Sequence, residues 1–139
     1  MSKVYTCPIF RALPGWQYHK TSFEDYKLKG IVPDYFGRDA ELSLPDVHHI
    51  HLAHTDELAA EWVERYPHIS QVYYRTTRIS EPENDYWLIY AYDDVDQCYL
   101  LLTIVGPEAH NQDKWRSYLN GLLISIVEPW IQGRLEGVE

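Results

Sequence analysis

The sequence contains few cysteines and no long apolar run. Its two cysteines, Cys7 and Cys98, lie far apart in no metal-binding spacing, so we expect free, buried thiols in a reducing compartment. No apolar segment approaches the length that crosses a bilayer. The first ten residues, MSKVYTCPIF, lack the apolar core and cleavage site of a secretory signal. These absences predict a cytoplasmic protein with no membrane partner.

Positive charge is also scarce. The chain carries 12 Lys and Arg against 21 Asp and Glu, a formal net charge of −9, which argues against a protein that binds nucleic acid by coating its phosphates. The charge is uneven, because residues 1–38 hold six basic and three acidic residues and are net positive. That first quarter could contact an anion, although an ordinary mixed surface explains it equally well.

The remaining composition is that of a soluble globular protein. Hydrophobic residues make up 45% of the chain and charged residues 24%, as expected for one core-forming unit. The length fits a single domain, residues 1–139.

Capping and stop signals predict three helices. A capping box at Thr21 begins a helix that runs through Lys29 and ends at Gly30. Thr55 caps a second helix, residues 56–66. Helical periodicity covers residues 114–127, and Pro129 is expected to kink or end that helix.

Branched and aromatic residues predict the strands, while residues 33–46 are expected to be irregular. The predicted strands are residues 4–10, 47–53, 71–77, 86–92 and 99–105, with a hairpin loop at 93–97. The order of elements predicts a small α+β domain, in which helices at the N-terminal side and a C-terminal helix flank an antiparallel sheet.

Four of the seven histidines lie in one predicted strand, in the stretch HHIHLAH at residues 48–54. Side chains alternate along a strand, so His49 and His51 share one face of the sheet. Ile50 and Leu52 share the opposite face, which is expected to pack against the core. His49 and His51 are then expected to point outward or into a cleft. Two adjacent imidazoles can exchange protons near neutral pH, and a solvated strand edge is the plainer interpretation.

A metal site is the third interpretation of the histidine pair. Zinc needs a further protein ligand, for which His110, Asp46 and Asp39 are candidates. No HExxH motif is present, and two alternating histidines alone are a weak ligand signal. We therefore predict no metal and no cofactor.

A longer pattern changes the balance between these interpretations. The stretch YKLKGIVPDYFGRDA, residues 26–40, is followed by HIHLA at residues 49–53. This combination resembles the YafO family of bacterial type II toxins. Weaker matches follow at YRT (74–76), WLIY (87–90) and PEAH (107–110), so the resemblance runs from about residue 20 to the last helix.

The resemblance implies a RelE/ParE-like fold and a ribosome-dependent mRNA interferase that a cognate antitoxin silences. The implied partners are the antitoxin, the ribosome and mRNA. The residues that match the family's motifs, and that the resemblance makes catalytic candidates, are His49, His51, His110, Arg38 and Asp39.

Metal-independent RNA cleavage suits these residue types. The ribose 2′-OH attacks the phosphate, which requires a base, an acid for the departing 5′ oxygen and positive charge at the phosphate. Histidines supply the first two, and Arg38, Arg75 or Lys27 the third. Tyr90 and Trp87 are candidates for stacking a base, with sheet core as the alternative. Arg38 and Asp39 also fit a structural ion pair.

Two other functions remain open at this point. The acidic composition suits a non-catalytic member of the same fold that binds a protein partner. The histidines also suit a metal-dependent hydrolase.

Overall fold

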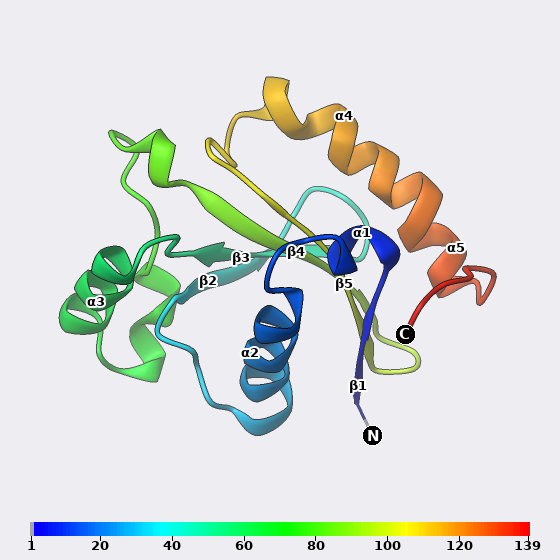
Figure 1. Cartoon of the computed structure of the whole chain (residues 1–139), viewed down its shortest axis with the longest axis horizontal. Coiled ribbons are helices and arrows are strands. Elements are labelled where there is room, and N and C mark those ends of the chain that lie inside the picture. Colours follow the sequence, from blue (N-terminus) through cyan, green and yellow to red (C-terminus); the bar gives the residue numbers. More distant parts are fainter. Residues whose placement is uncertain (1) are drawn as a thin grey trace.

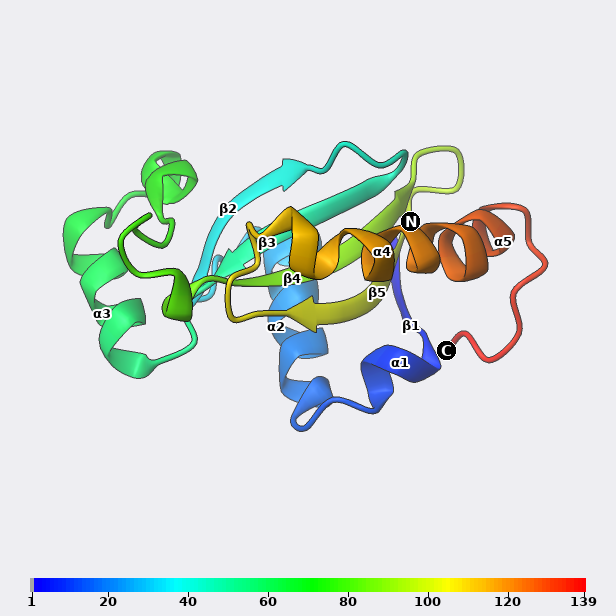
Figure 2. The ribbon, with the colours of Figure 1, turned by 90° about the horizontal axis from the view of Figure 1, so that it is seen from above.

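The computed structural model describes residues 2–139 and contains one five-stranded sheet with helices on both faces (Figures 1 and 2). The strands lie in the order β1-β5-β4-β3-β2. Their bounds are β1 (Lys3–Thr6), β2 (Phe36–Glu41), β3 (Val47–Leu52), β4 (Tyr86–Asp93) and β5 (Cys98–Val105). The α+β class is as predicted.

The sheet is mixed, so the prediction of an antiparallel sheet was wrong for one strand. β1 pairs with β5 in parallel, with Val4 opposite Tyr99, whereas the other neighbours are antiparallel. Hairpin signals in the sequence report only strands that follow each other closely. The first strand pairs with the last, and no local pattern gives the direction of such a pairing.

The helices form a layer on each side of the sheet. α2 lies on one face, and α4 and α5 lie on the other, while α3 sits beyond one end (Figures 1 and 2). The α-helices are α1 (Pro8–Arg11), α2 (Trp16–Lys29), α3 (Asp56–Arg65), α4 (Gln112–Leu122) and α5 (Glu128–Ile131). Short turns add the 3-10 helices η1 (Ile69–Tyr74) and η2 (Pro82–Asn84) and the π-helix η3 (Leu123–Val127).

The first two predicted helices are confirmed, although α2 begins earlier than predicted and α3 ends one residue earlier, at Arg65. α2 ends at Lys29 with Gly30 in the left-handed conformation at φ 70°, but it begins at Trp16, five residues before the capping box. The preceding turn ends in Gly15, also left-handed, and the helix starts directly after it. α3 begins as predicted, because Thr55 Oγ1 accepts a hydrogen bond from the backbone N–H of Leu58.

The C-terminal helix continues past Pro129 to Ile131, so Pro129 does not end it. α4 passes through the wider turn η3 into α5, where Pro129 occupies the first turn. Inside this continuous helix Pro129 cannot donate a backbone hydrogen bond, and the wider π turn directly before it makes room for its ring.

Three strand predictions are confirmed, two others differ, and one segment predicted to be irregular contains a strand. β3, β4 and β5 occupy the predicted runs, and residues 94–97 form the turn between the last two. The run at 4–10 ends as a strand at Thr6, because Pro8 begins α1. The run at 71–77 lies mostly in η1, and the supposedly irregular 33–46 contains β2. β2 is stabilised by its pairing with β3, and the residues of β2 alone do not indicate that pairing.

β2 contains a bulge that positions the site. Phe36 pairs with Leu52 and Asp39 with Ile50, so Gly37 and Arg38 together stand opposite His51. A Cβ atom on Gly37 would lie 2.1 Å from the carbonyl oxygen of Arg75. That carbonyl accepts a hydrogen bond of 3.0 Å from the backbone N–H of Arg38. Only glycine fits this approach of the two backbones.

One buried cluster runs through both faces of the sheet, and a smaller one lies under α3. Phe23 of α2 packs edge-on against Tyr90 of β4, and Trp62 of α3 is buried with Ala53. Cys7 is a buried free thiol as expected, while Cys98 is a partly exposed one. No helix within residues 2–139 is both long and apolar enough to cross a membrane.

Candidate functional site

β3 distributes its histidines over both faces of the sheet, as strand alternation predicts. Ile50 and Leu52 are buried, and His48 lies on their face. His49 and His51 lie on the α4 face, but they do not point outward, because they are 8% and 2% exposed. The aromatic neighbours that cover them explain this burial.

Trp87 is the centre of a cluster of three histidines. It is the direct cross-strand partner of His51, and its ring centroid lies 4.2 Å from that of His49, 5.5 Å from His51 and 4.6 Å from His110. Trp87 is itself 7% exposed. Its present contacts are therefore with imidazole rings, and it holds residues from two distant segments together.

His49 and His51 are uncharged at neutral pH. Burial lowers the pKa of His49 to about 4, although a hydrogen bond of 2.9 Å from Nδ1 to the carbonyl of Ala40 acts against the shift. Burial, with the neighbouring His49, lowers the pKa of His51 to about 3. Both side chains can accept a proton or donate an N–H, but neither holds a positive charge near pH 7.

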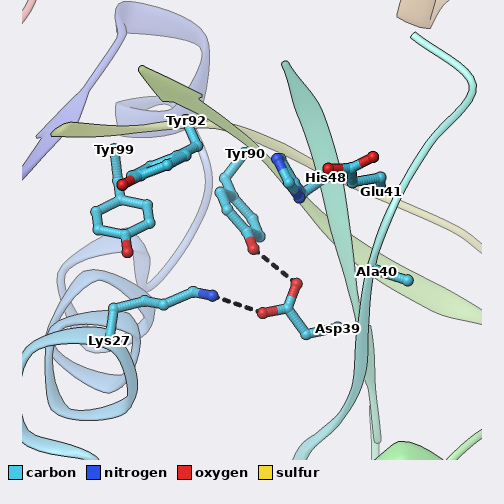
Figure 3. A pocket seen from close by; sticks show the side chains of 8 residues that line it. All are labelled: Lys27, Asp39, Ala40, Glu41, His48, Tyr90, Tyr92 and Tyr99. Atoms are coloured by element: carbon cyan, nitrogen blue, oxygen red, sulfur yellow. Dashed lines mark hydrogen bonds and ion pairs between the residues drawn. The ribbon is translucent and has the colours of Figure 1, made fainter. Parts of the chain in front are cut away.

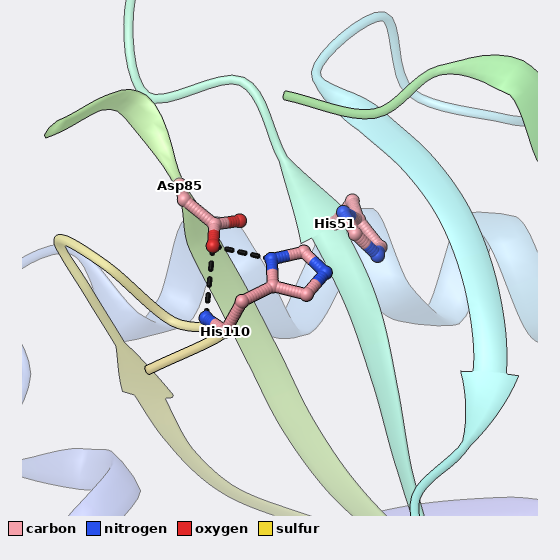
Figure 4. Close-up of side chains that lie close together, drawn as sticks. All are labelled: His51, Asp85 and His110. Carbon is pink, nitrogen blue, oxygen red and sulfur yellow. Dashed lines mark hydrogen bonds and ion pairs between the residues drawn. The ribbon is translucent and has the colours of Figure 1, made fainter. Parts of the chain in front are cut away.

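His110 is the exposed histidine of the three, and a carboxylate supports it (Figure 4). Its Nδ1 and its backbone N–H lie 2.5 Å and 2.8 Å from Oδ2 of Asp85, whose side chain is 5% exposed. An ionised carboxylate can only accept, so Nδ1 carries the hydrogen and Nε2 is left free. The ring centroids of His110 and His51 are 5.3 Å apart.

Asp85 was missed by the sequence analysis. It stands directly before β4, two positions from Trp87, and an acidic residue at the start of a strand has no distinctive pattern. The connection between β5 and α4, residues 106–111, brings His110 to it, since the backbone N–H of Ala109 donates to the carbonyl of Asp85. Only the folded chain reveals that juxtaposition.

Arg38 lies on the same face as these histidines. Its Nε donates to the carbonyl of Tyr73 at 2.8 Å, and its guanidinium stacks 4.0 Å from the Tyr73 ring centroid. Its positive charge contributes to the lowered pKa of both His49 and His51. Arg38 therefore provides a cation at the edge of the histidine cluster.

A cleft of about 300 Å³ opens beside His110. It lies between the β2–β3 connection and α4, and Trp87, Trp115 and Arg116 contribute to its wall. The remaining lining residues are Leu42, Ser43, Leu44, Ala109, His110, Gln112, Leu119 and Asn120. Aromatic rings, amides and one guanidinium are groups that contact nucleotides.

Asp39 lies on the opposite face, in an electrostatic cluster of its own (Figure 3). It accepts hydrogen bonds from Tyr26, Tyr90 and Lys27 at 2.8, 2.6 and 2.6 Å. Burial, with Asp39 next in effect, raises the pKa of Tyr90 far above its usual value. A cavity of about 400 Å³ adjoins this cluster, with His48 in its wall.

The nine predicted site residues thus fall in three places. His49, His51, His110, Arg38 and Trp87 gather on the α4 face, while Lys27, Asp39 and Tyr90 gather on the α2 face. Arg75 is 5% exposed at the C-terminal end of η1, where its guanidinium donates to the carbonyl of Tyr66 at 2.7 and 3.2 Å.

Comparison with known protein families identifies the family of this chain. A family described as toxin YafO of a type II toxin–antitoxin system matches residues 24–132, which is more than half of the chain. The matched segment contains β2, β3, Asp85 and His110, and with them the histidine cluster. No curated protein and no solved structure matches. The chain belongs to the YafO family of type II toxin–antitoxin toxins.

Proposed function

We propose that the chain is a metal-independent endoribonuclease that cuts mRNA on the ribosome and is silenced by an antitoxin. The Asp85–His110 pair carries the proposal, because it places a supported, exposed imidazole at the mouth of a cleft and next to a cationic edge. Membership of a toxin family also supports a toxic activity that an antitoxin silences.

In the proposed reaction His110 is the base. Its free Nε2 takes the proton of the ribose 2′-OH, and Asp85 stabilises the imidazolium that forms, as a buried carboxylate does behind a catalytic histidine. The 2′ oxygen then bonds to phosphorus and the bond to the 5′ oxygen breaks. The products are a 2′,3′-cyclic phosphate and a 5′-hydroxyl end.

Arg38 and the two buried histidines have different tasks in this scheme. The guanidinium of Arg38 stabilises charge on the phosphate oxygens. His49 and His51 are neutral at pH 7, so they can donate N–H hydrogen bonds but cannot act as protonated acids. The acid for the departing 5′ oxygen is then supplied from outside the chain, which would make cleavage depend on the ribosome.

The four predicted RNA contacts remain predictions. Trp87, Tyr90 and Arg75 are buried, and Lys27 is paired with Asp39, so each would have to leave a present partner to reach RNA. Arg116 and Trp115 line the cleft beside His110, and we propose these two as additional RNA contacts.

Cleavage of ribosome-bound mRNA by the purified protein tests the proposal. Wild type, stripped with EDTA and desalted, is incubated at fixed Mg²⁺ with a zinc-selective chelator and either naked mRNA or programmed ribosomes, and the new ends are analysed. We expect 5′-hydroxyl and cyclic phosphate ends with ribosomes only. His110→Gln should reduce the rate about 10²–10⁴-fold, and Asp85→Asn about 10²-fold or more.

His68→Gln is the matched control, because His68 is exposed and lies just before η1. It should cleave at the wild-type rate. Equal cleavage by wild type and His110→Gln, or no cleavage by wild type on ribosomes, would rule out the proposed reaction.

A further inference from the structure

Three buried polar atoms beside His110 have no partner. Within residues 2–139, the buried side-chain atoms that lack a hydrogen bond are Nδ1 of His51, Oδ1 of Asp85 and Nε1 of Trp87. Leaving such a group unpaired costs about 1–3 kcal/mol. All three belong to one cluster, and two of them are atoms that ligate metals.

The same cluster has the geometry of a cation site. His51, Asp85 and His110 each offer one ligand atom, and these atoms lie within 4.8 Å of one another. Figure 4 shows the ring of His110 between Asp85 and His51. Two imidazoles and one carboxylate are ligands of Zn²⁺ and other divalent transition metals in sites that keep a position for water.

Burial and access also suit an ion. His51 and Asp85 are 2% and 4% exposed, so they are held in place by packing, while the side chain of His110 is 61% exposed and gives a route from solvent. The hydrogen bond between His110 and Asp85 explains why those two residues meet. It does not explain why the imidazole of His51 is buried beside them with an unpaired nitrogen.

We propose that His51, Asp85 and His110 bind one divalent transition-metal ion such as Zn²⁺. This ligand set differs from those that the sequence suggested, because Asp39 is committed to Tyr26, Tyr90 and Lys27 on the other face. In a second step that rests on the proposed function, the bound ion inhibits cleavage. The ion bonds to the same lone pair of His110 that takes the proton from the ribose 2′-OH. His110 therefore cannot act as the base while the ion is bound.

Binding is measured first, independently of any activity. The full chain, stripped with EDTA and desalted, is titrated with Zn²⁺ by calorimetry and with Co²⁺ by visible absorption. We expect one ion per chain and Co²⁺ bands of an imidazole-containing site. His110→Gln and His51→Gln should each weaken binding at least about 10-fold.

The controls are His68→Gln and Cys98→Ser, which change an exposed imidazole and the partly exposed thiol. Both should bind like wild type. His110→Gln alters an exposed side chain, and circular dichroism should show that this variant is folded. Its titration therefore tests the metal site even if His51→Gln is unstable. Wild-type binding no tighter than that of His110→Gln overturns the site.

Cleavage on ribosomes at fixed Mg²⁺, with added Zn²⁺ and then with a zinc-selective chelator, tests the inhibition. We expect activity lost with Zn²⁺ and restored by the chelator. Binding without loss of activity overturns the inhibition and leaves the site. Activity that requires the ion contradicts both the inhibition and the metal-independent mechanism. An absence of cleavage under every condition contradicts the proposed function, while the titrations still decide whether the site exists.

Discussion

Asp39 and Asp85 are two carboxylates with different roles, one on each face of the sheet. Asp39 accepts from two tyrosine hydroxyls and from Lys27, and all of its partners are protein groups. Asp85 leaves one oxygen unpaired and directs the other to an exposed histidine. A fully partnered carboxylate contributes mainly to stability, whereas a partly partnered one beside solvent is available for chemistry.

Asp39→Asn should destabilise the fold by about 2–3 kcal/mol. The change removes the charge that compensates Lys27, whose side chain is only 20% exposed. Urea unfolding measures the loss. Asp25→Asn is the matched control, because its pair with Lys29 is at the surface, and it should change stability by less than about 1 kcal/mol. A stable Asp39→Asn that has lost cleavage would instead support the predicted catalytic role of Asp39.

Acid should destabilise the fold through His49 and His51. Their folded pKa values of about 4 and 3 lie below the unfolded value of 6.5. Between these values the unfolded chain binds more protons than the folded one, so stability falls as pH falls below about 6.5. At pH 5 we expect a loss of about 2 kcal/mol per histidine.

Urea unfolding in EDTA at pH 7.5 and pH 5 measures this loss. The double variant His49→Gln, His51→Gln should show a much smaller difference between the two pH values. Equal stability of wild type at both pH values would mean that these histidines are protonated in the folded protein.

At the scale of the element, local signals were sufficient for some segments and insufficient for others. α3, β4 and β5 carry their own caps or branched runs and were predicted. β2 was missed because glycine and charged residues in Phe36–Glu41 conceal a strand that exists by pairing with β3. η1 has strand-like residues, but it coils beside the edge strand β2, where the backbone N–H of Arg38 donates to the carbonyl of Arg75 at the end of η1.

Gly37→Ala tests the bulge in β2. The added methyl would collide with the carbonyl of Arg75 and approach Trp62 to 3.0 Å, so we expect a loss of about 3 kcal/mol in the free energy of unfolding. Gly121→Ala is the matched control. Gly121 lies in α4 with nothing within 4 Å of an added Cβ, and the change should stabilise by roughly 0.5–1 kcal/mol. A neutral Gly37→Ala would contradict the close backbone contact.

At the scale of the molecule, the basic first quarter is mostly neutralised. Four of its six basic residues form ion pairs, namely Arg11, Lys20, Lys27 and Lys29. Arg38 is the member of that group beside the histidine cluster. The number of basic residues in the sequence therefore overestimates the positive surface available to phosphate, because residue spacing does not show which charges are paired.

Strand alternation did place His49 and His51 together, and the family resemblance added His110.

Binding to ribosomes should depend only weakly on salt if the proposed function holds. Three cations lie near the candidate site, Arg38, Lys114 and Arg116. Each phosphate contact to single-stranded RNA contributes a slope of about −0.7, so log affinity against log salt should fall with a slope no steeper than about −2. Ribosomes carrying a 2′-O-methylated mRNA, at fixed Mg²⁺, provide the measurement. A much steeper slope would point to a basic surface elsewhere.

The bulge at Gly37 and Arg38 also determines which charge each face receives. If β2 kept all its residues and paired with β3 in regular register from Phe36 onward, Asp39 would stand opposite His49 instead of Ile50. The carboxylate would then lie on the face of the histidine cluster, and Arg38 would lie on the face of Lys27. The bulge therefore sets the electrostatic difference between the two faces of the sheet through the register of a single strand.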